Sequence, residues 1–268
     1  MNTENLLFAF TLTAFAGLST GIGSLIVITG RQMSTKFLCG SLGFSAGVML
    51  YVSLVEIMGK AKISLVEVAG NTLGNWYTLL GFFAGIAVIA LIDKLIPARE
   101  NPHEIGNMNT DNISDARKKK LLRMGLFSAL AIGIHNFPEG LVTFLGALEN
   151  PTLGVSLALA IAIHNIPEGI AVAVPVYYAT KSKLKAFWIS FAWGIAEPIG
   201  ALLGYFILLQ FFSPLTFGII FAAVAGIMVY ISLDELLPTA EEYGEHHIVM
   251  YSLIAGMAVM GMSLVLFV

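Results

Sequence analysis

The sequence has little charge and almost no cysteine. Only 12% of its 268 residues are charged and 57% are hydrophobic, whereas an ordinary soluble domain is about 25% charged and about 45 to 50% apolar. This composition excludes a soluble globular fold. The single cysteine, Cys39, also excludes an internal disulfide and a thiolate metal site.

Basic tracts are also scarce. The formal net charge is −3, and the only run of consecutive basic residues lies at 117–120. Nucleic-acid binding needs a basic face that can neutralise phosphates. We therefore expect no nucleic-acid partner, and we expect membrane lipid to surround the chain.

Apolar runs of about 20 residues are what the chain has instead, and each run is long enough to cross a bilayer as a helix. We predict an all-α integral membrane protein in which residues 1–268 form a single transmembrane domain with eight transmembrane helices. The first run lacks the basic start of a cleaved signal and should stay in the protein. The expected spans are 5–29, 36–58, 77–97, 121–147, 152–178, 185–209, 214–238 and 248–268.

The distribution of basic residues predicts the orientation of these spans. With the N-terminus outside, the outer loops hold only Lys60 and Lys62 of the 14 Lys and Arg residues, and the inner side holds the rest. Cytoplasmic loops of membrane proteins are enriched in Lys and Arg. Both termini should therefore lie outside. The polar stretch at about 98–120 should be a flexible cytoplasmic loop.

Two segments repeat within the chain. Residues 129–141 match residues 158–170 at ten of thirteen positions, and residues 46–58 match residues 225–237 at seven of thirteen. A fainter match sets Gly17, Ile22, Gly23 and Leu25 of the first span against Gly194, Ile199, Gly200 and Leu202 of the sixth. The matched spans run in opposite directions, so we predict a 3+2+3 inverted-repeat bundle, an arrangement typical of secondary transporters.

The strongest repeat is the motif His-Asn-x-Pro-Glu-Gly, which occurs on the fourth and fifth spans. Each copy places the glutamate four positions after the histidine, so the imidazole and the carboxylate face the same side of a helix. The pairs are His135 with Glu139 and His164 with Glu168. Four ionisable side chains inside a membrane need a compensating partner, and a divalent cation supplies one. Two imidazoles and two carboxylates suit zinc and other first-row divalent ions.

Neighbouring residues extend this predicted site. Asn136 and Asn165 follow the histidines and could ligate a cation or orient its ligands. Glu197 precedes a proline on the sixth span and could bridge to a second metal. The alternative for each residue taken alone is a helix-to-helix hydrogen bond.

Acidic residues also lie near the span ends. Glu56 on the second span and Asp234 and Glu235 on the seventh occupy equivalent places in the repeat. We interpret them as entry and exit points of a transport pathway; interfacial capping is the alternative. The segment 241–247 carries acids and histidines and fits a solvated loop better than a site that receives departing cations.

At these motifs the sequence resembles the ZIP (Zrt/Irt-like) family of divalent metal transporters and looks closest to its bacterial ZupT-like branch. The resemblance covers nearly the whole chain. It implies a binuclear metal centre, alternating access of an elevator-like kind, a bacterial inner membrane, and uptake of zinc, iron, manganese, cobalt or cadmium into the cytoplasm. Many members have a histidine-rich loop between the third and fourth spans, and here only His103 remains.

Carried over by motif, the resemblance implies two metal positions. The first would be formed by His135, Glu139, His164 and Glu168. The second would be formed by Asn136, Asn165 and Glu197, with Glu139 and Glu168 as bridges.

Three functions compete at this point. A metal importer would carry Zn²⁺, Fe²⁺ or Mn²⁺ as transported ion, without a resident cofactor; homodimer formation stays open. An intramembrane metal-dependent hydrolase would use the same ligands to activate water, but the chain has no His-Glu-x-x-His motif. A metal-sensing receptor would need a larger soluble domain than any loop here provides.

Overall fold

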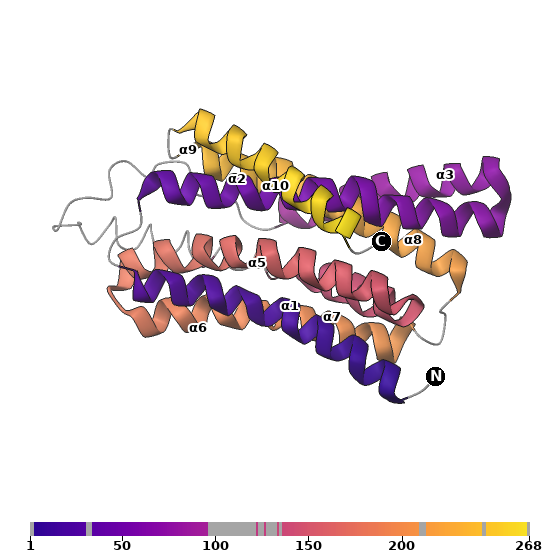
Figure 1. Cartoon of the computed structure of the whole chain (residues 1–268), viewed down its shortest axis with the longest axis horizontal. Helices are drawn as coiled ribbons and strands as arrows, with labels where there is room; N and C mark the ends of the chain where they lie inside the picture. The colour runs from indigo at the N-terminus through magenta and orange to yellow at the C-terminus, as the bar shows by residue number, and fades with distance from the viewer. Residues whose placement is uncertain are drawn as a thin grey trace.

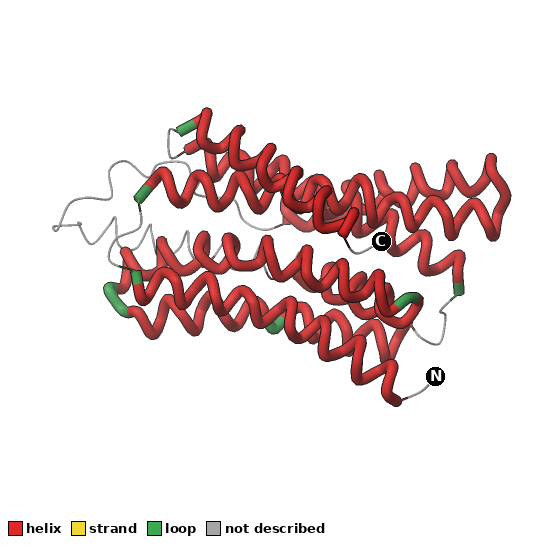
Figure 2. Tube along the Cα trace, in the orientation of Figure 1, coloured by secondary structure: helices red, strands yellow, loops and turns green. Residues whose placement is uncertain are grey.

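A computed structural model describes residues 3–30, 34–95, 122, 126, 133, 136–208, 213–242 and 245–266. Within these ranges the structure is helical and contains no strand, as Figure 2 shows. The prediction of an all-α membrane protein is therefore confirmed at this level. The predicted loop at 98–120 lies outside the described residues.

Helices of very different length make up the structure. The α-helices are α1 (Thr3–Thr29), α2 (Thr35–Tyr51), α3 (Met58–Leu95), α5 (Pro151–Thr180), α6 (Lys183–Gly194), α7 (Ala196–Leu203), α8 (Pro214–Ile231), α9 (Leu237–Glu242) and α10 (His246–Leu266). Residues 136–149 are also helical. Short π-helical stretches occur at η1 (Val52–Ile57), η2 (Gly204–Leu208) and η4 (Ser232–Leu236).

Polar caps fix where several of these helices begin. Ser34, Ser182 and Ser213 each accept a hydrogen bond from a backbone N–H of the first turn that follows. The Asn150 side chain accepts from the N–H groups of Thr152 and Leu153, at 2.8 and 3.3 Å. These side chains satisfy N–H groups that have no partner inside the helix. The helix starts predicted near 36, 152, 185 and 214 agree with these caps to within a few residues.

Six helical stretches of the described chain are long and apolar enough to cross a membrane: Thr3–Thr29, Thr35–Ile92, Pro151–Thr180, Lys183–Phe206, Pro214–Glu241 and His246–Leu266. The stretch Thr35–Ile92 covers the predicted span 36–58 and residues 77–92 of the predicted span 77–97. The predicted span 121–147 lies partly outside the described residues.

Gly70 divides the long stretch into two antiparallel arms. Its φ of 77° and ψ of 168° lie in a region that L side chains rarely adopt. The chain therefore turns back inside α3, and Figure 1 shows the resulting hairpin projecting at one end of the molecule. The arm before Gly70 continues the helix well past the predicted span end at 58. Ser64 holds this arm on α8 by donating from Oγ to the Pro214 carbonyl at 2.7 Å.

The helices form two packed groups, which Figure 1 draws one above the other. We call α1, the segment 136–149, α5, α6 and α7 the α5 group, and α2, η1, α3, α8, η4, α9 and α10 the α8 group. Within the groups α1 packs on α5 and α6, α3 packs on α8, and α2 packs on α10. The groups meet where α2 contacts α5.

Glycines allow the closest approaches in the α8 group. A Cβ at Gly47 would overlap the Leu253 carbonyl on α10, and a Cβ at Gly226 would overlap the Phe82 carbonyl on α3. Gly47 and Gly226 occupy the same place in the repeat of the second and seventh spans. Small residues let helix backbones approach where lipid gives no hydrophobic drive for association.

The α5 group has the same kind of paired contact. A Cβ at Gly23 would overlap the Ile166 carbonyl of α5, and a Cβ at Gly200 would overlap the Phe137 carbonyl. Gly23 and Gly200 are equivalent in the match between the first and sixth spans. These contacts seat α1 on α5 and α7 on the segment 136–149, next to both copies of the His-Asn-x-Pro-Glu-Gly motif.

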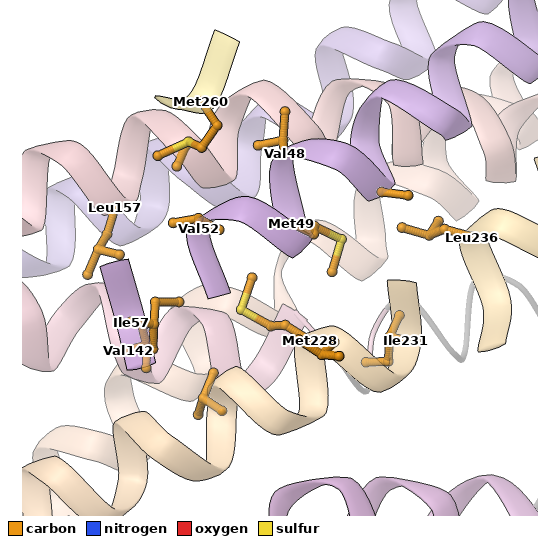
Figure 3. Packing of buried hydrophobic residues seen from close by; sticks show 14 of the residues in the cluster. Val48, Met49, Val52, Ile57, Val142, Leu157, Met228, Ile231, Leu236 and Met260 are labelled. Carbon is orange, nitrogen blue, oxygen red and sulfur yellow. The ribbon is translucent and has the colours of Figure 1, made fainter. Parts of the chain in front are cut away.

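Apolar side chains fill the interior of the α8 group. Met49, Met228 and Met260 are at most 1% exposed, and Figure 3 shows them beside the branched side chains of Val52 and Ile231. The flexible thioether of Met fills irregular gaps between helices. The fully buried histidine and carboxylate side chains of the described residues all lie in the α5 group.

Candidate metal centre

A cluster of fully buried polar side chains lies in the α5 group. Its members have 0% exposure and come from 136–149, α5 and α7: Asn136, Glu139, His164, Asn165, Glu168 and Glu197. Six of the seven predicted metal ligands are therefore buried. The seventh, His135, lies outside the described residues.

α5 carries three members of the cluster within little more than one helical turn. The helix runs through Pro167 without interruption, so this proline removes a backbone N–H without ending the helix. His164 and Glu168, four residues apart, consequently lie on one face, as their spacing predicted.

The polar side chains meet between helices in two pairs. His164 Nε2 lies 3.3 Å from Glu139 Oε1, which joins α5 to the segment 136–149. Asn165 donates from Nδ2 both to Glu197 Oε1 on α7 and to the Ala16 carbonyl on α1, the latter at 2.9 Å. A carboxylate from each of two further segments thus reaches the α5 motif.

A break in the sixth span positions Glu197. α6 ends at Gly194, and α7 begins at Ala196, while the Ile195 N–H bonds to the Ala192 carbonyl at 3.3 Å. Glu197 thereby lies in the first turn of α7, directly before Pro198. A Cβ at Gly140 would overlap the Glu197 carbonyl, so only glycine allows this approach.

Several buried polar atoms of the cluster lack a hydrogen-bond partner within the described part of the chain: both side-chain atoms of Asn136, Oδ1 of Asn165 and Oε2 of Glu197. Each such atom costs about 1 to 3 kcal/mol when it is left unsatisfied. Among the described residues, no three His, Cys, Asp or Glu side chains group closely enough to hold a metal ion. The cluster therefore consists of oxygen and nitrogen atoms that could ligate a metal. Two pairs of its side chains are in contact, and several of its atoms have no hydrogen-bond partner among the described residues.

Comparison with known proteins identifies the family. The family model described as ZIP Zinc transporter matches residues 95–266. The chain belongs to the ZIP family. It is 65% identical over 266 residues to the zinc transporter ZupT of Chlorobium chlorochromatii (strain CaD3), with 99% of each chain covered. It is also 56% identical over 280 residues to ZupT of Clostridium perfringens (strain 13 / Type A), covering 100% of this chain and 98% of that one.

The acidic residues predicted for the pathway of this ZIP chain lie on its π-helical stretches. Glu56 is on η1, half-buried, with Oε1 3.8 Å from Lys60 Nζ. Asp234 and Glu235 are on η4, where Asp234 is exposed and Glu235 is half-buried. π-helical turns are rare in proteins, and those that occur often lie at functional sites.

The two π-helical stretches have the same local support. Ser53 donates from Oγ to the Met49 carbonyl at 2.5 Å, and Ser232 donates to the Met228 carbonyl at 2.8 Å. Both serines occupy the same place in the repeat. Each of these carbonyls also accepts a backbone N–H, from Val52 for Met49 and from Ser232 for Met228, so the serine hydroxyl adds a second donor to it.

Three residues at this centre have no place in the predicted site: Ala16, Ser45 and Thr20. Ser45 on α2 donates from Oγ to the His164 carbonyl at 3.2 Å and so ties the α8 group to the α5 motif. Ala16 contributes only a backbone carbonyl, for which no side-chain pattern exists. Thr20 does have a signal, because it falls at the place of Glu197 when the first span is set against the sixth.

The segment at 241–247 has exposed polar contacts away from this cluster. His246 Nδ1 lies 3.0 Å from Glu241 Oε1, and Lys36 Nζ lies 3.9 Å from Glu245 Oε1. Exposed pairs of this kind contribute little to stability. Their exposure fits the predicted solvated segment, but the prediction of a loop is wrong for most of it, because 241–242 end α9 and 246–247 begin α10.

Proposed function

We propose that this ZIP-family chain carries zinc across a bacterial inner membrane into the cytoplasm. The chain is a multi-pass membrane protein and a divalent metal transporter, not an enzyme, by its family membership and its similarity to zinc transporters over nearly its full length. The single observation that carries the proposed site is the buried set of carboxylate, imidazole and amide groups around α5. Because the family and its relatives are transporters, a hydrolase using the same ligands is set aside.

The zinc site is proposed to be binuclear. His135, Glu139, His164 and Glu168 would form the first position. Asn136, Asn165 and Glu197 would form the second, with Glu139 and Glu168 bridging. His164 lies 3.3 Å from Glu139, which supports the first position, and Asn165 hydrogen-bonds to Glu197, which supports the second. Nitrogen and oxygen ligands of this kind suit Zn²⁺ and would also admit Fe²⁺ or Mn²⁺.

Eight spans in a 3+2+3 inverted repeat are proposed as the architecture that holds this site, within one transmembrane domain. The equivalent glycine contacts support it: Gly47 and Gly226 each pack against a carbonyl of the neighbouring third or eighth span. The equivalent π-helical stretches η1 and η4 support it as well. Both termini would lie outside, since that orientation keeps most basic residues on the cytoplasmic side.

Transport is proposed to proceed by alternating access. The α5 group would carry the ion and move relative to the α8 group. Glu56 would serve the outer entrance, and Asp234 and Glu235 would serve the cytoplasmic exit. The half-buried or exposed positions of these three acids contrast with the fully buried cluster and support roles outside it. A second copy of the chain as a homodimer partner is compatible with this arrangement.

Zinc uptake into proteoliposomes tests the proposal. Glu139→Gln removes a charge at the cluster, and Glu149→Gln removes one from an exposed position on the same helical segment. We expect the unsubstituted chain and the Glu149 variant to carry zinc and the Glu139 variant to lose at least about 100-fold in rate, since a first ligand is removed. Equal uptake by both variants would refute the proposed site.

A further inference from the structure

Thr20 is an exception among the buried hydroxyls of α1. Thr13 donates from Oγ1 to the Ala9 carbonyl at 3.0 Å, Ser19 to the Ala16 carbonyl at 2.6 Å, and Ser24 to the Thr20 carbonyl at 3.2 Å. Thr20 is equally buried, at 0% exposure, yet its Oγ1 has no hydrogen-bond partner in the part of the chain that the structure describes. A hydroxyl in a membrane helix ordinarily bonds back to its own helix. The Thr20 hydroxyl does not, so it is available to bind a ligand.

The position of Thr20 places its hydroxyl at the junction of α1, α5 and α6. A Cβ at Gly194 would lie 3.1 Å from both Cβ and Oγ1 of Thr20, and a Cβ at Gly169 would overlap the Thr20 carbonyl. Gly169 directly follows Glu168 on α5. One turn before Thr20, the Ala16 carbonyl accepts the hydrogen bond from Asn165. Thr20 therefore borders the cluster on the side of α1.

The packing of Thr20 repeats the packing of Glu197. A Cβ at Gly17 would lie 3.2 Å from Glu197 Cβ, just as a Cβ at Gly194 would lie 3.1 Å from Thr20 Cβ. Gly17 and Gly194 are equivalent in the match between the first and sixth spans, and so are Thr20 and Glu197. The contacts give this faint sequence match a physical basis.

The asparagines complete this equivalence. Asn165 on α5 hydrogen-bonds to Glu197, and the equivalent pair in the other half is Asn136 with Thr20. Within the described residues, both side-chain atoms of Asn136 and Oγ1 of Thr20 lack partners. Buried unpaired polar groups in such numbers call for an ion or water that they bind.

We propose that Thr20 is a further residue of the cation site, which with Asn136 forms an uncharged half opposite Asn165 and Glu197. This inference rests on the proposed function. The Thr20 hydroxyl supplies an oxygen to the entering cation and its hydration water. Glu139, Glu168 and Glu197 already supply three carboxylates. Thr20, which is equivalent to Glu197 in the repeat, adds a neutral oxygen ligand without another negative charge, so the cation stays bound weakly enough to be released.

Matched substitutions separate this role from helix packing. Thr20→Val keeps the shape and removes the hydroxyl, whereas Thr20→Ser keeps the hydroxyl and removes the methyl group. Thr13→Val is the control, because Thr13 is equally buried on the same helix and its hydroxyl bonds to its own backbone. Each variant is purified as the full chain, and zinc uptake into proteoliposomes and the melting temperature without metal are measured.

The expected pattern has opposite signs in the two measurements. Thr20→Val should raise KM for zinc by about 10-fold, as loss of a supporting ligand does. Its melting temperature without metal should stay equal or rise, because an unsatisfied buried hydroxyl is gone. Thr20→Ser and Thr13→Val should keep KM within about 2-fold of the unsubstituted chain, which is smaller than the loss expected for a ligand.

Two results would overturn the inference. An unchanged KM in Thr20→Val, or a KM raised more by Thr20→Ser than by Thr20→Val, would show that Thr20 only packs against Gly194. These results leave the proposed function standing, provided that the unsubstituted chain carries zinc and Glu139→Gln does not. If the unsubstituted chain carries none, the proposed function and the role of Thr20 fall together.

Discussion

The two helix groups differ in which polar groups they bury. In the α8 group, the buried hydroxyls of Ser53, Thr78 and Ser232 each donate to a carbonyl one turn earlier on their own helix. In the α5 group, a buried imidazole, three carboxylates and two amides lie close together; His164 meets Glu139 and Asn165 meets Glu197 between helices, and several atoms of the cluster have no hydrogen-bond partner among the described residues.

This difference separates polar groups that stabilise the fold from those available to a ligand. Both groups use glycine for close helix contact, so packing alone does not distinguish them. A hydroxyl that bonds to its own helix adds no new requirement on its surroundings. A carboxylate in a membrane costs several kcal/mol unless something compensates its charge, and we assign that compensation to the transported cation.

After the loss expected for Glu139→Gln, the largest effect should come from removing the amide that joins α5 to α7. Asn165→Leu breaks the hydrogen bonds to Glu197 and to the Ala16 carbonyl, so kcat/KM for zinc should fall by about 10- to 100-fold. Asn75→Leu is the control, at a half-buried position where the amide donates to Asn71 within the same α3 hairpin. Uptake kinetics that remain equal in both variants would contradict the role of Asn165.

A smaller effect, on folding, should follow from a change in the α8 group. The added methyl in Gly226→Ala overlaps the Phe82 carbonyl, which should lower the free energy of unfolding by about 1 to 3 kcal/mol. Gly59→Ala is the control, because a Cβ there meets nothing within 4 Å. Denaturation in detergent measures both. A loss of zinc affinity at unchanged stability would contradict the division between the groups.

Ser45 tests the contact between the two groups. Ser45→Ala leaves the His164 carbonyl without the hydrogen bond that crosses from α2, and such bonds contribute about 0.5 to 1.5 kcal/mol. We expect the uptake rate to change by about 5-fold, the equivalent of that energy, because the two groups move relative to each other in the proposed cycle. Ser53→Ala, whose hydroxyl bonds within its own helix, should leave the rate unchanged.

The smallest effect is expected at the hydroxyls of the α8 group. Thr78→Val and Ser232→Ala each remove a bond to the same helix, and the freed carbonyl loses little, so stability should change by less than about 0.5 kcal/mol. Thermal melts with and without zinc check this. A loss of more than about 2 kcal/mol in either variant would show that the α8 group also depends on its buried polar groups.

The sequence predicts the helical class and most helix starts, because hydropathy and capping residues such as Asn150 and Ser213 act locally. It does not predict that the helix continues past residue 58 to Gly70, since that arm is held by its contact with α8. The π-helical stretches are also missed, because a 3.6-residue pattern does not register one inserted residue.

The buried cluster is predictable for a different reason. Polar identities such as His164 and Glu168 stand out in an apolar sequence and repeat at fixed spacing. Ser45 and Ala16 do not stand out: a serine is common in a membrane helix, and a backbone carbonyl has no sequence signature. Their roles depend on which helix lies opposite, and only the tertiary structure gives that.

An anomalous difference map at the zinc edge, from crystals of the full chain grown with zinc, tests the central claim most directly. The account predicts zinc about 2.0 to 2.2 Å from a nitrogen of His164 and from oxygens of Glu139 and Glu168. Zinc found only at exposed groups such as His246 and Glu241, with none in the buried cluster, would contradict it.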